Sequence, residues 1–362
     1  MKEIDITRER FKEAKKLFKT IKQECEAEVV SWFWASSDLY SLEPYYYERN
    51  KYSRGKALKE EPAKKENKCQ YGANSNGDIV VERNFCLEEY FYEIFYKRTS
   101  DLVEKFRYDY ADKHLVWVER YWLSDGQVIE QHFCDEDKIR IVETYEYHNN
   151  KLIKSFRDGS YGKSTFLYEY SEIGEIVQIL WNNKPCYTKP DKKKTIKQLI
   201  ELSEERLYQL TFDYLKQSAI TEKLYAIALH YGNDNYFPAS VAFATEQQRT
   251  EWITEKGKMA NQIIWLPIEY EYNYDFYEAL PKETKKLFEL CNQEVSMQSK
   301  DSAARTSIAR VAKRLNEQRT EFDFDTTDDF IIFATDYELA DLKKNMKLID
   351  PTFFEKVKKQ LL

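Results

Sequence analysis

Residues 115–133 read LVWVERYWLSDGQVIEQHF, and two runs of alternating apolar and polar residues stand on either side of Ser124-Asp125-Gly126. Successive side chains of a strand point to opposite faces, so a period of two residues predicts β-strands. A short break that contains Asp-Gly is typical of a β-hairpin. The stretch therefore predicts two neighbouring antiparallel strands.

The same alternation extends over about residues 87–181. Further apolar runs, KIRIVETYEY, KLIKSF, STFLYEY and EIVQILW, follow the short polar breaks CDED, HNN, RDGSYG and SEIG. Breaks of this length allow each strand to pair only with its neighbours in the chain. Residues 100–181 are therefore predicted to form one antiparallel meander with hairpin order.

Tyrosines mark one of these hairpins, YEYSEIGEIV at residues 168–177. The segment resembles the tyrosine–aspartate repeats of bacterial Rhs-type toxin shells, whose unit Y-x-Y-D-x-x-G-x-L it matches at four positions, Tyr168, Tyr170, Gly174 and Ile176. Poorer copies start at Tyr108 and Tyr145, so the copies start 37 and then 23 residues apart. A repeat array keeps one period. We therefore interpret the segment as a hairpin in a finite sheet, with its two tyrosines on one face.

Helical periodicity stands before and after the meander. Before it, apolar residues recur at three- and four-residue spacing, namely Phe11, Ala14, Leu17, Phe18, Ile21 and Cys25. After it, NNKPCYTKPDKKK (residues 182–194) combines two prolines with a basic cluster, which indicates a domain boundary. We predict an α+β protein: an N-terminal helix plus antiparallel β-meander (1–183), a linker (184–195) and a C-terminal α+β domain (196–362).

The second half mixes strands with a larger number of helices. Residues 224–231, 239–244 and 328–335 are predicted strands. Helix starts are predicted at four places: Thr245 in a capping box with Gln248, Pro281, Asp336 and Asp350-Pro351. Residues 224–248 resemble the core of an uncharacterised bacterial domain family found near polymorphic-toxin genes. That resemblance extends over residues 200–362 and implies no catalytic residues.

Composition restricts the class of protein. The 362 residues are 42% hydrophobic and 15% aromatic, which is too apolar for a disordered chain. The formal net charge of −7 does not attract a nucleic-acid backbone globally. The six cysteines are scattered, and the sequence has neither an apolar leader at its N-terminus nor an apolar run of membrane-spanning length. A cytoplasmic protein with reduced thiols and no membrane partner is expected.

Several motifs fall short of a catalytic or metal site. DGSYGKST (158–165) ends like a phosphate-binding loop, but a predicted strand follows it where such a loop needs a helix, so a hairpin turn is expected. The four histidines lack metal-ligand spacing. EFDFDTTDDF (321–330) lacks the glycine and the glutamate of an EF-hand loop. We expect no catalytic residue, metal or cofactor; the sequence favours binding and leaves enzymatic activity open.

The most distinctive segment is WLPIEYEYNYDFYEAL, residues 265–280, where aromatic and acidic residues alternate. As a strand it would have one aromatic and one largely acidic face. One interpretation is an edge strand whose tyrosines pack on the core. The other is an exposed surface that binds a basic protein, because tyrosines supply contact area and carboxylates steer a cationic partner. The candidate partner-binding residues are Glu271, Tyr272, Tyr274, Asp275 and Tyr277.

A basic helix, ARTSIARVAKRLNEQR (304–319), carries the opposite charge. Two interpretations are again open: a surface of ion pairs, or a phosphate-binding face that contacts nucleic acid. The candidate nucleic-acid residues are Arg305, Arg310, Lys313 and Arg314.

These observations predict a non-enzymatic protein-binding module, an immunity or defence protein that neutralises a basic toxin partner. The alternative is an antiphage-defence effector or enzyme that acts on nucleic acid through the basic helix.

Overall fold

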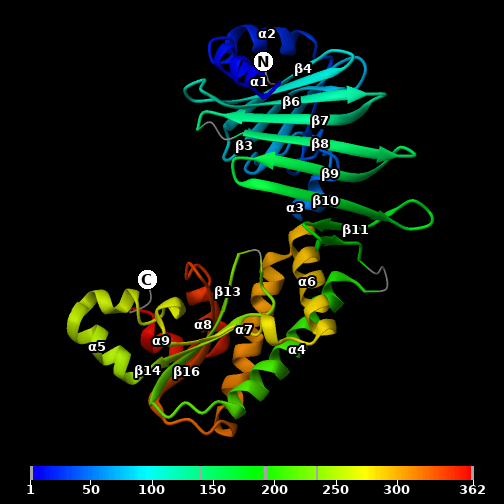
Figure 1. Ribbon diagram of the computed structural model, residues 1–362. Coiled ribbons are helices and arrows are strands. Elements are labelled where there is room, and N and C mark those ends of the chain that lie inside the picture. The colour runs from blue at the N-terminus through cyan, green and yellow to red at the C-terminus, as the bar shows by residue number, and fades with distance from the viewer. Residues whose placement is uncertain (1–2, 138–139, 191–193, 234, 360–362) are drawn as a thin grey trace. The chain divides into compact units, whose positions relative to one another are not determined.

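The chain divides into two units, Met1–Lys189 and Pro190–Leu362, in a computed structural model that describes residues 3–137, 140–190, 194–233 and 235–359 (Figure 1). Each unit has its own sheet. The prediction of an α+β protein with an N-terminal helix, an antiparallel meander and a C-terminal α+β region is confirmed.

The first unit is a twelve-stranded antiparallel meander in which every strand pairs with the next one along the chain (Figure 1). The predicted hairpin order of residues 100–181 is confirmed. Its helices are α1 (Glu3–Ala14), α2 (Phe18–Ala27) and α3 (Tyr46–Asn50). Its strands are β1 (Ser31–Ala35), β2 (Lys68–Ala73), β3 (Ile79–Phe85), β4 (Tyr90–Arg98), β5 (Leu102–Asp109), β6 (Leu115–Ser124), β7 (Gln127–Asp135), β8 (Arg140–His148), β9 (Lys151–Gly159), β10 (Gly162–Tyr170), β11 (Ile176–Trp181) and β12 (Lys184–Thr188).

Two-residue turns set the register of three hairpins. The turn residues Asp125-Gly126, Asn149-Asn150 and Asn182-Asn183 all have positive φ angles. Positive φ at both positions defines the type I′ turn, whose twist matches that of paired strands. The third turn joins β11 to β12. The predicted linker was therefore wrong for residues 184–188, which form β12 and pair with β11.

The helices α1 and α2 pack on one face of this sheet. The residues at the centre of that face are apolar and pair across successive strands, in the order Val81, Phe95, Phe106, Val118 and Cys134. Phe11, Ala14, Ile21 and Cys25, predicted to line one helix, are buried there, although residues 15–17 interrupt the helix and make it two.

The segment of residues 36–58, which includes α3, lies on the opposite face of the sheet. Tyr45 contacts both tyrosines of the YEY motif, with ring centroids 5.4 Å from Tyr168 and 6.4 Å from Tyr170. The interpretation that these two tyrosines share one face of a hairpin is therefore confirmed. Other polar side chains of this face form a cavity considered below.

The second unit has a four-stranded sheet in the order β15-β14-β13-β16, with β13 and β16 parallel (Figure 1). Its strands are β13 (Leu224–Tyr231), β14 (Ser240–Thr245), β15 (Tyr272–Tyr274) and β16 (Thr326–Asp336). Its α-helices are α4 (Ile196–Gln217), α5 (Glu246–Lys256), α6 (Lys282–Met297), α7 (Asp301–Glu317), α8 (Leu342–Ile349) and α9 (Pro351–Val357). Short 3₁₀ helices occupy Gly257–Gln262, Pro267–Glu269, Tyr277–Ala279 and Arg319–Glu321.

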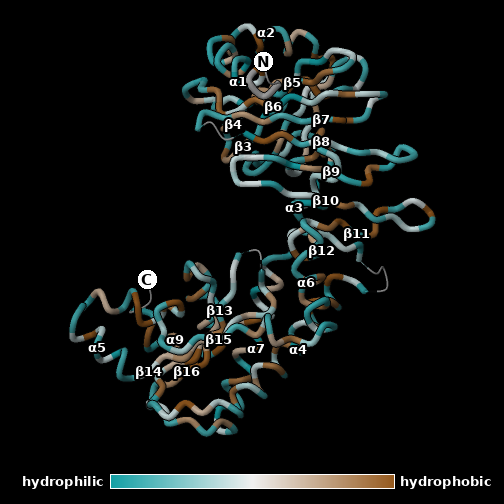
Figure 2. The backbone as a smooth tube through the Cα atoms, in the orientation of Figure 1, coloured by the Kyte–Doolittle hydropathy of each residue, from teal (hydrophilic) through white to brown (hydrophobic). Residues whose placement is uncertain are grey.

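All eight residues of β13 are buried, as expected of a central strand covered on both faces. Hydrophobic residues are concentrated along β14 and β16 (Figure 2). The helices α7 and α8 contact β16, and α5 contacts β14.

Helix starts in this unit follow the predicted caps with two differences. The Thr245 side chain accepts a hydrogen bond from the Gln248 N–H, but the Gln248 amide bonds residues 269 and 271 rather than completing a capping box. Asp350 caps α9 as predicted. Asp336 was wrongly predicted to open a helix: it ends β16 and accepts a bond from the Asp341 N–H, just before α8.

Candidate functional site

The tyrosine-rich segment forms the edge of the second unit's sheet. β15 pairs with β14, with Tyr272 opposite Phe243 and Tyr274 opposite Val241. Only three residues are in the strand, and Tyr277 lies in the 3₁₀ helix that follows. The predicted alternation over the whole segment is therefore shorter than expected, because 3₁₀ turns flank the strand on both sides.

Alternation nevertheless decides what β15 exposes. Tyr272 and Tyr274 are half-buried and packed against the core, while Glu271 and Asp275 are exposed. The tyrosine rings therefore contact the core, as the edge-strand interpretation expects. Their remaining exposed area stands next to carboxylates in solvent, as the binding interpretation requires.

Tyr274 belongs to a cluster of rings contributed by α4, β14, β15 and the residues that follow β15. Its ring stacks on Tyr214 with a centroid distance of 4.2 Å and an interplanar angle of 14°. Tyr214 also contacts Phe276 at 5.5 Å and Phe243 at 6.1 Å. Aromatic pairs in such geometries gain attraction beyond their buried area, so β15 is held firmly against α4.

The acidic stretch of residues 321–330 joins the same cluster. Phe324 lies 5.9 Å from Phe243, and Phe322 lies 5.4 Å from Phe212 of α4. The Leu224 N–H donates to the Asp325 carbonyl oxygen at 2.8 Å, which fixes the stretch beside the start of β13. Two segments that are far apart in the sequence therefore meet.

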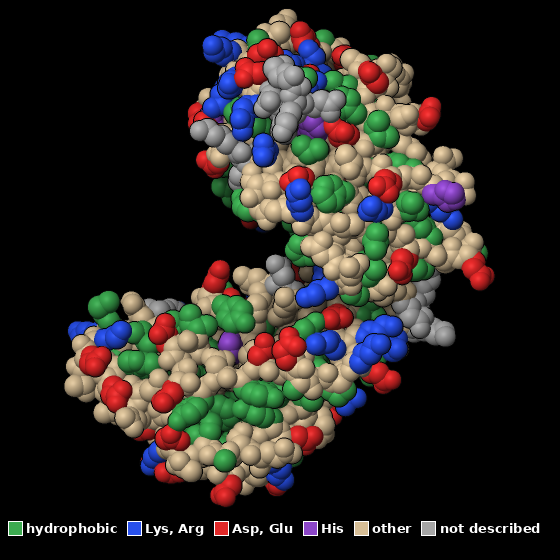
Figure 3. Space-filling model, viewed as in Figure 1, with side chains coloured by type: hydrophobic (Ala, Val, Ile, Leu, Met, Phe, Trp, Pro, Cys, Tyr) green, Lys and Arg blue, Asp and Glu red, His purple; other side chains and the backbone are tan. Residues whose placement is uncertain are grey.

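We call this set of rings the aromatic face. Its members are Phe212, Tyr214, Tyr272, Tyr274, Phe322 and Phe324, of which all but Phe322 are half-buried. Figure 3 shows a broad patch of hydrophobic side chains on the second unit, in the region where Figure 1 draws β14, β16 and the end of α4.

The three segments that carry the aromatic face are rich in carboxylates. Residues 212–216, 271–275 and 321–325 contain Asp213, Glu271, Asp275, Glu321, Asp323 and Asp325 but a single cation, Lys216. The Tyr272 hydroxyl donates to Glu222, which raises the pKa of Tyr272 to about 12 and lowers the pKa of Glu222. Lys216 pairs with Glu321 at 3.2 Å. The segments that carry the rings are therefore acidic.

The basic helix α7 carries the predicted nucleic-acid residues, and three of the four have carboxylate partners. Arg310 donates to both oxygens of Glu204, and Arg314 donates to Glu205 at 2.8 Å. Arg305 donates to Asp341 at 3.1 Å, while Lys313 is exposed.

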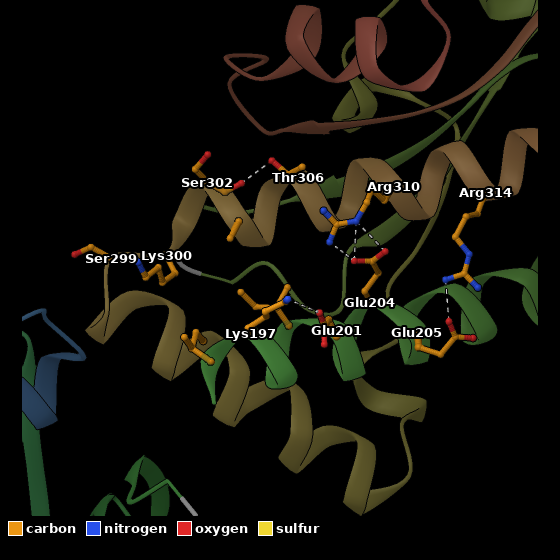
Figure 4. A pocket seen from close by; sticks show the side chains of 13 residues that line it. Lys197, Glu201, Glu204, Glu205, Ser299, Lys300, Ser302, Thr306, Arg310 and Arg314 are labelled. Carbon is orange, nitrogen blue, oxygen red and sulfur yellow. Dashed lines mark hydrogen bonds and ion pairs between the residues drawn. The ribbon is translucent and has the colours of Figure 1, made fainter. Parts of the chain in front are cut away.

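A groove of about 890 Å³ lies between α4 and α7. Figure 4 shows that the side chains of Arg310 and Glu204 reach across it toward one another. The apolar residues that line it include Ile196, Ile200 and Ala303. Because each of its two arginines already has a carboxylate partner, the groove presents little unneutralised positive charge.

The structure also shows where the motifs that lack the features of a catalytic or metal site lie. DGSYGKST spans the β9–β10 hairpin, and Lys163 stands in β10, 3.5 Å from Asp158, so the expected hairpin turn is confirmed. A pocket of about 430 Å³ adjoins this turn, but Arg157 on its wall is paired with Glu143 at 2.7 Å. Across the described ranges, no group of three or more His, Cys, Asp or Glu side chains could hold a metal ion.

The sequence interpretation missed four of the six rings of the aromatic face, namely Phe212, Tyr214, Phe322 and Phe324. A signal existed in EFDFD (321–325), which alternates aromatic and acidic residues as YEYNYD does. Phe212 and Tyr214 had no comparable signal, because their roles depend on contacts with distant segments.

Comparisons with known proteins yield weak similarity alone. No family model matches the chain, and no curated protein matches it. A porin-like protein from Bacteroides uniformis is 18% identical, with 33% of this chain and 50% of that chain covered at a TM-score of 0.24. A porin-like protein from Bacteroides vulgatus is 11% identical, with 38% and 85% covered at a TM-score of 0.28. The chain thus spans half the length of the first of these structures, and TM-scores this low carry no argument about function. No helix of the described residues is long and apolar enough to cross a membrane.

Proposed function

We propose that this chain is a non-enzymatic protein-binding module that captures a basic partner on the aromatic face. The observation that carries the proposal is the meeting of the segments around Tyr272 and Phe324 at Phe243; together with residues 212–216 of α4, these segments contain six carboxylates and one lysine. These are the two acidic–aromatic segments of the sequence, and the fold places them on one surface.

The physical chemistry of such a surface suits protein recognition. Binding energy concentrates in a few aromatic residues that become fully buried on association. Tyr272 and Tyr274 are half-buried already, so they are ordered before a partner arrives and lose little entropy on binding. Exposed carboxylates around them attract a cationic partner and raise its association rate.

An immunity or defence protein that neutralises a basic toxin is the particular role we propose for this module. The supporting features are the acidic chain, the acidic surroundings of the face, and the two sequence resemblances to toxin-associated proteins. Toxins that attack nucleic acid are often basic because they must approach phosphates, and an acidic inhibitor complements them.

Binding of nucleic acid through α7 receives less support. Arg305, Arg310 and Arg314 would have to leave their carboxylate partners to bind phosphate, and breaking such charge-assisted bonds costs free energy. Lys313 alone among the four candidates is exposed without such a pair among the described residues.

The test begins with capture of binding partners from the source organism by the full chain, followed by association kinetics with the captured protein. Tyr272→Ala is expected to weaken binding by about 2 kcal/mol, the usual loss at an interface aromatic, while the unit stays folded. Tyr274→Ala is expected to destabilise the unit as well, because its ring stacks on Tyr214.

Charge reversal separates steering from contact. Glu271→Lys and Asp275→Lys should slow association several-fold at low salt and much less at high salt, since salt screens exposed charges. Glu255→Lys on α5 is the matched control with the same charge change outside the face. An acidic partner, or unchanged kinetics in all four variants with the fold retained, would overturn the proposal. Binding of a labelled DNA duplex that Lys313→Glu abolishes would favour the helix α7 instead.

A further inference from the structure

A polar cavity of about 240 Å³ lies in the first unit, on the sheet face opposite α1 and α2. Strands β3 to β6 form its floor, and residues 38–46 form its other wall. Glu82 pairs across the sheet with Ile94, and Ile94 pairs with Arg107, so the three lie in one row of the floor. Lys105 and Glu119 face each other in the next row.

Most charged groups of this cavity already have partners. Lys105 lies 3.3 Å from Glu119, which also accepts a hydrogen bond from the Tyr121 hydroxyl at 2.7 Å. The Tyr96 hydroxyl donates to Glu82 at 2.8 Å. These contacts fix the floor of the cavity before any ligand enters.

The covering wall is fixed as well. One carboxylate oxygen of Asp38 accepts bonds from the hydroxyls of Tyr47 and Tyr71, at 3.2 and 3.3 Å, and from the Tyr40 N–H at 3.3 Å. The Tyr40 hydroxyl in turn accepts from Arg98 at 2.5 Å. A wall held to the sheet by bonds from Tyr71 and Arg98 preorganises the space beneath it.

Two polar atoms of the cavity have no partner in this network. Arg107 has no carboxylate within 4 Å among the described residues, and its contacts are the rings of Tyr92 at 3.5 Å and Trp117 at 5.8 Å. Its Nε atom is buried and has no hydrogen-bond partner in the described part of the chain, and the same holds for Oδ1 of Asn84. The cavity thus offers a guanidinium group without a carboxylate partner and, two strands away, a carbonyl oxygen without a donor beside Glu82.

We propose that this cavity binds a small zwitterion of the α-amino-acid class, with the ligand carboxylate on Arg107 and the ligand ammonium between Glu82 and Asn84. A guanidinium binds a carboxylate through two parallel hydrogen bonds, and an ammonium supplies three donors to oxygen acceptors. Strands are about 4.8 Å apart, so the backbones of β3 and β5 are separated by about 10 Å. Two long side chains that converge on a ligand of this size bridge such a span.

Protonation of Glu82 makes this binding depend on pH. Burial raises the pKa of Glu82 to about 7, against the opposing effect of Lys105 and with a further rise from Asp38. The other polar groups around it include Tyr96, Asn84, the more distant Glu119, and Tyr71, which pairs with Glu82 across β2 and β3. An ammonium binds the ionised carboxylate, so affinity should rise several-fold from pH 6 to pH 8.

The proposal is independent of the aromatic face, which belongs to the other unit, and calorimetry on the full chain tests it. Each of the twenty L-amino acids is titrated, and the best ligand is compared with its analogues that lack the amine or the carboxylate. Both analogues should bind at least about tenfold more weakly, because each leaves one charged group of the cavity unpaired. Arg107→Lys keeps the charge but loses the fork, and Glu82→Gln loses the charge at constant size.

Both variants are expected to reduce affinity about tenfold or more, and Glu82→Gln should also abolish the pH dependence. Arg206→Ala, an exposed arginine of the second unit, is the control and should change nothing. Failure of all twenty amino acids to bind, equal binding of the analogue without an amine, or unchanged affinity in both folded variants overturns the proposal.

Discussion

An arginine that contacts glutamates occurs in each unit, and the two clusters differ mainly in burial. In the first unit Arg49 lies 3.1 Å from Glu43 and 2.9 Å from Glu143, and the three side chains are 2%, 11% and 0% exposed. In the second unit Arg310 pairs with Glu204, and the arginine side chain is 45% exposed. The same kind of ion pair is thus buried between the sheet and its covering segment in the first unit, and lies at the surface of a helix in the second unit.

The difference teaches what each cluster does. The Arg49 cluster joins the covering segment of residues 36–58 to strands β8 and β9, because Arg157 completes it with bonds to both glutamates. The Arg310 cluster links α4 to α7 at the surface. The buried ion pairs of the first unit therefore hold a cavity wall in place, whereas the ion pairs of the second unit neutralise the positive charge of α7.

The largest effect is expected from Arg49→Met. It leaves Glu43 and Glu143 buried with only Arg157 as a cation, and removing one partner of a buried ion pair costs about 3–5 kcal/mol. Urea unfolding followed by circular dichroism should show an early transition of the first unit. The double variant Arg49→Met/Glu143→Leu should recover part of the loss. Unchanged stability in the single variant would contradict the burial of this cluster.

A smaller effect is expected from Glu82→Gln, and it depends on pH. The pKa of Glu82 is raised from 4.5 to about 7, so the folded chain binds more protons than the unfolded chain between these values. Stability from this group is therefore lost as the pH rises through that range, by about 3 kcal/mol. Glutamine removes the loss and can still accept the bond from Tyr96.

Unfolding free energies of the two proteins at pH 4.5 and pH 8 measure this effect. The variant should gain about 3 kcal/mol relative to the unsubstituted chain between the two pH values. Other titrating groups cancel in the comparison. A difference that does not change with pH would show that Glu82 titrates normally.

Local signals made the first unit largely predictable from its sequence. Alternation and dipeptides such as Asp125-Gly126 act within a few residues, and they gave the strands and their order. Residues 184–188 were assigned to the linker because KPCYT contains a proline, although the structure makes them a strand. A proline in a strand at the edge of a sheet is tolerated because one side of that strand has no partner.

Contacts between residues that are far apart in the chain could not be predicted from the sequence. Parallel pairing of β13 with β16 joins residues that are about a hundred positions apart, and the aromatic face depends on the same closure. Glu82 and Glu119 stand in the middle of apolar runs, where alternation alone assigns them to solvent. Their burial follows from residues 36–58, whose irregular sequence gave no indication of what it covers.

Loss of a surface ion pair between α4 and α7 should lower stability much less than loss of the buried Arg49 cluster. Arg314→Met removes an ion pair whose side chains are 36% and 61% exposed, and such pairs contribute about 0–1 kcal/mol. The methionine retains part of the contact with Tyr208. A loss as large as that of Arg49→Met, in the same urea titration, would remove the distinction between the two clusters.

The smallest effect is expected from Lys163→Ala in the hairpin that resembles a phosphate-binding loop. Lys163 and Asp158 are 68% and 52% exposed and lie 3.5 Å apart, so solvent screens their attraction. A phosphate-binding loop needs converging backbone N–H groups and a following helix, whereas Gly162 here begins a strand that pairs with β9. The variant should therefore match the unsubstituted chain in stability and in its response to ATP or GTP in a thermal-shift assay. If the unsubstituted chain binds nucleotide and the folded variant does not, this turn is a phosphate site. The surface of the first unit would then hold a functional charge that burial does not reveal.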